Sequence, residues 1–215
     1  RERRPVQDVV AHRFTKRELE LVYAALASLP SGLLDEEDGH YSYRPVSLEN
    51  FHEGSGGRSN MVMAPLAMRD AEKLRRIIAN PDVAAWLERF SDEELVELSY
   101  IRIYLHEKAH RIYWRLTDEQ RQAYSAISWD VSTMTSRNTS TKSADAIAYP
   151  DAHLMIRYAF PESDNSEEDF VDHFTAYRLF GPQFKAAAAR AEPLGGKYRF
   201  FNEQVFNGIE YAEPY

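Results

Sequence analysis

Hydrophobic residues recur at spacings of three and four along most of the chain, a pattern that predicts amphipathic helices. Two of these helices begin with a capping box, in which a Ser or Thr side chain and a Glu three residues later each bond the other residue's backbone N–H. The two pairs are Thr15 with Glu18 and Ser91 with Glu94. Further helices are predicted over residues 68–80, 81–90, 117–129 and 166–180, and a last element over residues 197–211.

The pattern changes between residues 39 and 64, where short alternating stretches surround a glycine-rich turn. These stretches, and the later segment "HLMIRYAF", predict strands, whereas the Ser- and Thr-rich residues 131–146 predict a loop. We therefore predict an α+β fold in a single domain, residues 1–215. Its upper lobe, about residues 1–90, would hold a small mixed sheet, and its lower lobe, about residues 91–215, would be mostly helical. Residues 60–64 are interpreted either as the edge strand of this sheet or as an interior strand.

Composition and charge exclude several classes of function. The absence of cysteine rules out disulfides, thiolate metal sites and cysteine nucleophiles, so that any metal must be held by His and carboxylate side chains. The net charge of −8 argues against nucleic-acid binding, and no run of eighteen apolar residues predicts a membrane span. We expect a soluble protein. Because the sequence begins with Arg, we expect a segment of a longer or processed protein. It shows no signal peptide, and we assign neither a compartment nor an oligomeric state.

Residues 105–110 read LHEKAH within the helix predicted from Ser91. At about 100° per residue, His106 and His110 share one face of this helix, beside its core stripe. That face also carries apolar and aromatic residues, which predicts a central helix that is covered on two sides. The core stripe consists of Leu98, Ile101, Leu105, Ala109, Ile112 and Leu116.

Two histidines four residues apart on a helix can bind one zinc ion, with Glu107 directed at the water on the metal. Such a site needs a third protein ligand, and Glu168 is the candidate because Asp172 follows it by four residues on the helix over 166–180. Leu179 shares their face, which predicts that this face is covered too. Glu168 would bind zinc, while Asp172 would accept the far N–H of a ligand histidine.

Two structural alternatives stand beside the metal site. The histidine pair would instead be satisfied directly by neighbouring carboxylates, and Glu168 with Asp172 would instead form a solvated acidic face.

The stretches "LHEKAH", "EEDFVDHF" and "YRFFNEQV" resemble the gluzincin metallopeptidases, and most closely the group of the anthrax lethal factor catalytic domain and the Pro-Pro endopeptidases. The resemblance covers about residues 91–211. It implies a zincin-like fold, Zn²⁺ held by His106, His110 and Glu168, and Glu107 as the general base.

The same resemblance implies a tyrosine that stabilises the oxyanion shortly before the third ligand. Tyr158 is the candidate for this role, with Tyr149 and His153 as rivals. The chain departs from the family at Lys108 and Ala109, where many relatives have an apolar residue followed by glycine.

These observations predict a zinc-dependent endopeptidase that hydrolyses peptide bonds in a protein or peptide substrate. The alternative is a catalytically silent, zincin-like binding module that keeps the scaffold without turnover. The presence of Glu107 favours catalysis, because a purely structural metal site has no use for a base at that position.

Overall fold

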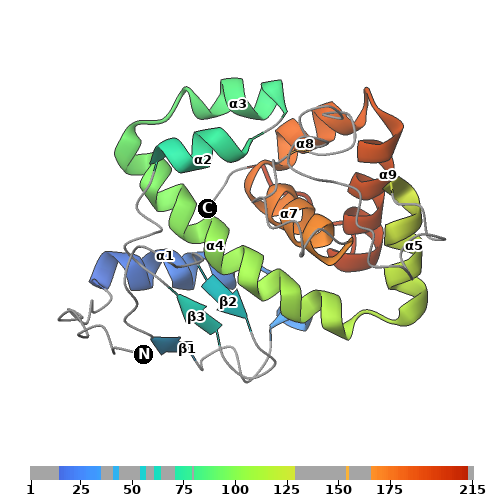
Figure 1. Ribbon diagram of the computed structural model, residues 1–215, viewed down its shortest axis with the longest axis horizontal. Coiled ribbons are helices and arrows are strands. Elements are labelled where there is room, and N and C mark those ends of the chain that lie inside the picture. Colours follow the sequence, from blue (N-terminus) through green and yellow to red (C-terminus); the bar gives the residue numbers. More distant parts are fainter. Residues whose placement is uncertain are drawn as a thin grey trace, which may run out of the picture.

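Helices make up most of the described structure (Figure 1). The computed structural model describes residues 15–34, 41–43, 54–56, 61–63, 71–78, 80–128, 154 and 166–212. The helical elements in chain order are α1 (Lys16–Ala27), η1 (Ser31–Leu33), α2 (Ala71–Ile77), α3 (Pro81–Leu87), α4 (Asp92–Arg115), α5 (Asp118–Ser128), α7 (Ser166–Leu179), α8 (Gly181–Ala188), α9 (Glu192–Phe200) and η4 (Phe201–Val205).

The strands among these residues are β1 (Tyr41–Tyr43), β2 (Gly54–Gly56) and β3 (Met61–Met63), each three residues long. The prediction of an α+β fold with a sheet-containing lobe is therefore wrong, since the described protein is mainly helical. The physical reason is that the apolar stripes of long helices such as α4 and α7 form the buried core. β3 pairs with both β1 and β2, which excludes its interpretation as an edge strand.

The predicted helix starts are confirmed by their capping bonds. The Thr15 N–H donates to Glu18 Oε2 at 2.7 Å while the Thr15 hydroxyl accepts from the Glu18 N–H at 3.2 Å. Ser91 and Glu94 form the same box at 2.8 and 3.3 Å. Because each box satisfies backbone donors that have no partner within the helix, local sequence alone fixes where α1 and α4 begin.

Helix α4 is the central element of the fold (Figure 1). Its 24 residues pack against α1, α2 and β2, and most extensively against α7. The predicted core stripe is confirmed from Leu98 to Ile112, while Leu116 is only partly buried. Ile103 and Tyr113 beside the histidines are buried as well, whereas Trp114 on the same side is exposed, so the second side of α4 is covered only in part. No helix in the described part of the chain is long and apolar enough to cross a membrane.

Helix α7 runs antiparallel to the second half of α4, because His106 lies beside Asp172 while Tyr113 lies beside Ser166. Aromatic packing sets this register: the Tyr113 and Phe170 rings lie 5.2 Å apart, and the two hydroxyls of Tyr113 and Ser166 are 3.2 Å apart. The core face of α7 is buried as predicted, and so are Thr175 and Leu179 on its other face.

The turn of α7 that carries Glu168 is also fixed from behind. Asp169 and Lys197 of α9 form an ion pair at 2.9 Å, and both side chains are fully buried. The Tyr124 hydroxyl donates to the Asp169 carbonyl oxygen at 3.0 Å, and His173 Nδ1 donates to the same oxygen at 2.7 Å. Three elements, α5, α7 and α9, therefore meet directly behind the acidic first turn of α7.

Candidate metal centre

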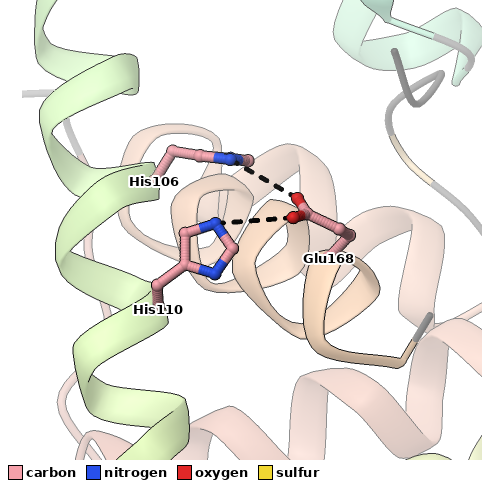
Figure 2. Close-up of side chains that lie close together, drawn as sticks. All are labelled: His106, His110 and Glu168. Carbon is pink, nitrogen blue, oxygen red and sulfur yellow. Dashed lines mark ion pairs between the residues drawn. The ribbon is translucent and has the colours of Figure 1, made fainter. Parts of the chain in front are cut away.

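The side chains of His106 and His110 extend from α4 toward Glu168 on α7 (Figure 2). His106 Nε2 lies 3.5 Å from Glu168 Oε2, and His110 Nε2 lies 3.6 Å from Glu168 Oε1. One ligand atom from each of the three residues falls within 4.8 Å of the other two. Two neighbouring turns of one helix and the first turn of another thus bring two nitrogens and a carboxylate together.

The spacing of these atoms fits a shared metal ion. Zinc binds histidine nitrogen and carboxylate oxygen at about 2.0–2.2 Å, which places two ligands of a tetrahedral site about 3.3–3.5 Å apart. The observed distances of 3.5 and 3.6 Å lie at the upper end of this range and just above it. They are longer than an ordinary hydrogen bond between nitrogen and oxygen, which ends near about 3.2 Å. Glu168 is therefore a poor hydrogen-bond partner for the two Nε2 atoms, although neighbouring carboxylates do contact both Nδ1 atoms, as the structural alternative expects.

The other nitrogen of each imidazole lies beside a second carboxylate. His106 Nδ1 is 3.3 Å from Asp172 Oδ1, as the spacing of Glu168 and Asp172 predicts. His110 Nδ1 is 2.7 Å from Glu167 Oε1. An ionised carboxylate only accepts hydrogen bonds, so a proton on each Nδ1 leaves the lone pair on Nε2. In its neutral form, each imidazole would then present the Nε2 lone pair toward Glu168.

Glu107 follows His106 on α4, and its side chain is almost completely buried, at 4% exposure. Its Oε2 atom has no hydrogen-bond partner among the described residues. Burial raises the pKa of this carboxyl, while the nearby imidazoles of His106 and His110 lower it in part. Leaving a buried acceptor without a partner costs about 1–3 kcal/mol, and groups held in such a state point to a functional role.

The carboxylates around His106 create a strongly negative environment. Burial alone lowers the pKa of His106, but the Asp172 carboxylate beside Nδ1 and the charges of Glu168 and Glu107 outweigh burial and raise the pKa to about 9. A site that stabilises the positive charge of an imidazolium will also stabilise a divalent cation that takes the place of the proton. The electrostatics therefore agree with the donor geometry.

The structure brings together five of the six residues to which the sequence assigns a role: His106, Glu107, His110, Glu168 and Asp172. The alternative of a solvated acidic face is disfavoured, because Glu168 and Asp172 contact histidines and are only 29% and 14% exposed. Tyr158 and its rivals Tyr149 and His153 lie outside the described residues, so the assignment of the oxyanion residue stays a prediction.

The contact between Glu167 and His110 was not predicted from the sequence. The only sequence signal of Glu167 is its place directly before Glu168, and an acidic residue at the start of a helix is common for electrostatic reasons alone. Whether Glu167 or another residue meets His110 depends on how α4 and α7 align. That alignment is set by contacts between residues far apart in sequence, such as Tyr113 and Ser166.

Comparison of the chain with protein-family models, with curated proteins and with solved structures finds no match. The resemblance to the gluzincins therefore depends on the residues themselves, with His-Glu-x-x-His on α4 and Glu-x-x-x-Asp on α7. Any functional conclusion follows from the chemistry of this site.

Proposed function

We propose that the protein is a zinc-dependent endopeptidase of the gluzincin type, which hydrolyses peptide bonds in a protein or peptide substrate. The observation that carries this proposal is the convergence of His106, His110 and Glu168 within 4.8 Å, beside the buried carboxylate of Glu107. Two histidines and one carboxylate are the three protein ligands of a catalytic zinc site that keeps its fourth position for water or substrate.

The donor set supports zinc over most other metals. The ligands are two imidazole nitrogens and one carboxylate, and a chain without cysteine offers no thiolate that would favour a closed structural site. Two histidines and one carboxylate also bind iron(II) in oxygenases. Glu107 distinguishes the two chemistries, because a general base beside the metal serves hydrolysis.

Within this proposal, the residues of the chain divide the work of hydrolysis. Bound zinc supplies Lewis acidity, lowering the pKa of water to about 7 and polarising the peptide carbonyl. Glu107 accepts the proton that the attacking water loses, and it passes this proton to the amine nitrogen as the peptide bond breaks. The burial that raises its pKa suits Glu107 to hold that proton between the two steps. Asp172 holds the His106 imidazole in the required orientation.

The alternative of a silent binding module makes a different demand on Glu107. A module that only binds a metal or a partner gains nothing from a buried carboxylate whose Oε2 lacks a hydrogen bond, and it would be more stable without that cost. The burial of Glu107 therefore favours the enzyme.

The test is the substitution Glu107→Gln, which keeps the shape of the side chain and removes its basicity. We expect zinc content equal to wild type and a loss of peptide cleavage of about 10²- to 10⁴-fold, measured by mass spectrometry on a broad peptide library. Glu93→Gln, in the exposed first turn of the same helix, is the matched control and should cleave as wild type does.

Full cleavage by the Glu107→Gln variant would contradict the mechanism. Wild-type protein that binds zinc but cleaves no peptide would instead support the binding module. Wild-type protein that selects iron over zinc would contradict the hydrolytic proposal altogether.

A further inference from the structure

We infer that Glu167 is a positioning residue for the second metal ligand, so that each of the two histidines has a carboxylate of its own. His110 Nδ1 lies 2.7 Å from Glu167 Oε1, a shorter contact than the 3.3 Å between His106 Nδ1 and Asp172. The inference rests on the proposed function, because it assigns Glu167 a role only toward a metal bound at this site.

The position of Glu167 determines which nitrogen of His110 faces the metal site. The 2.7 Å contact is in the range of charge-assisted hydrogen bonds, in which the carboxylate accepts the Nδ1 proton. The lone pair of His110 is then on Nε2, which lies 3.6 Å from Glu168 Oε1. A carboxylate partner also makes the imidazole a stronger ligand than a neutral acceptor would.

Packing alone does not select this orientation of the ring. The His110 ring meets the His106 ring edge to face at 5.1 Å and lies 6.0 Å from the Trp114 ring. These neighbours confine the plane of the imidazole, but a half-turn about the Cβ–Cγ bond keeps the same plane and moves both nitrogens away from their partners. The hydrogen bond to Glu167 distinguishes the two orientations.

The contact is also too sheltered to be an ordinary surface ion pair. The side chains of His110 and Glu167 are 12% and 25% exposed, whereas surface pairs such as Lys185 with Glu210 are about half exposed. Surface pairs contribute little because water screens them and both side chains lose freedom. Here α7 holds Glu167 in place through the neighbouring contact of Ser166 with Tyr113, so less freedom remains to be lost.

The experiment measures zinc affinity by competition with a chelator, together with the visible absorption of the Co²⁺-substituted protein. We expect Glu167→Ala to weaken zinc binding by up to about 100-fold. Glu167→Gln keeps an acceptor but loses the charge, and we expect a weakening of about 10-fold. The Co²⁺ spectrum should change in both variants, because it reports the arrangement of the ligands. Glu203→Gln, an exposed position on η4, is the control for the change of charge.

Zinc affinity and Co²⁺ spectra of both Glu167 variants equal to those of the control would overturn the inference and leave the proposed function intact. Wild-type protein that binds no zinc would instead overturn the proposed function. Thermal unfolding of the metal-free variants separates misfolding from a local effect. A variant that unfolds like wild type but binds zinc weakly supports the positioning role.

Discussion

Adjacent acidic residues of α7 lie in two different environments. Asp169 pairs with the ammonium of Lys197, and both side chains are fully buried. Glu167 and Glu168, the two residues before it, contact the imidazoles of His110 and His106 and remain partly exposed. The first environment contains a lysine cation, whereas the second contains imidazoles that can carry a proton and that, in the proposed function, bind a metal.

Adjacent acidic residues on one helix can therefore have different roles, one in stability and the others in the chemistry of a site. A buried carboxylate paired with lysine is hard to use for chemistry, because either charge alone would be costly to leave in the interior. The carboxylates of Glu167, Glu168 and Asp172 lie beside imidazoles, and their negative field favours a cation that binds there. The two sides of α7 should therefore respond differently to mutation, to metal and to pH.

The largest effect should come from the structural side. Lys197→Met leaves the Asp169 carboxylate buried without its ammonium, so we expect a loss of about 3–5 kcal/mol in the free energy of unfolding. Urea denaturation in the presence of a chelator measures it. The double variant Lys197→Met/Asp169→Leu removes both charges and should recover most of the loss. A loss below about 1 kcal/mol in the single variant would contradict the assignment of this pair to stability.

The next largest effect should come from the metal side. Glu168→Gln removes the charged ligand, and we expect zinc affinity to fall by more than about 100-fold, beyond the effect of an orienting residue. Isothermal titration with zinc measures this change. The metal-free variant should unfold close to wild type because Glu168 is on the partly exposed side of α7. A Glu168→Gln variant that is strongly destabilised without metal but still binds zinc would contradict the assignment of Glu168 to metal binding.

The smallest effect is the dependence on pH. The pKa of His106 is raised from 6.5 to about 9 in the folded, metal-free protein, so its proton stabilises that state fully below about pH 6.5 and less as the pH rises toward 9. Zinc must displace the same proton, so its affinity should rise by up to about tenfold per pH unit across this window.

Thermal unfolding between pH 6.5 and 9 tests this prediction with and without zinc. As the pH rises, the metal-free wild-type protein should become less stable relative to a His106→Asn variant. The zinc-bound wild-type protein should become more stable relative to the same variant. Parallel pH profiles for the two forms would be inconsistent with a shared proton and metal site at His106.

Local sequence signals predicted the helices and their faces well. The capping boxes at Thr15 and Ser91, and the Pro81 start of α3 behind Asn80, each depend on residues within one turn of the helix end. The single apolar residue Leu179 among the acidic positions also predicted that the second face of α7 is covered, and Leu179 is buried. These features are predictable because the spacing of apolar side chains and the hydrogen bonding of backbone groups at helix ends depend on a single helix.

The fold class and Glu167 were not predictable in the same way. Strand-like stretches between residues 39 and 64 suggested a sheet-containing lobe, but pairing extends over only three residues per described strand, and one of these strands is Gly-Ser-Gly, a composition poorly suited to strands. The contact of Glu167 with His110 requires the antiparallel alignment of α4 and α7. Both depend on contacts between distant segments that no local pattern encodes.

Anomalous diffraction at the zinc absorption edge from crystals grown with zinc tests the central claim most directly. We expect one strong peak per chain, bounded by His106 Nε2, His110 Nε2 and the carboxylate of Glu168. The absence of a peak there, with the Glu168 side chain turned away from both imidazoles, would contradict it.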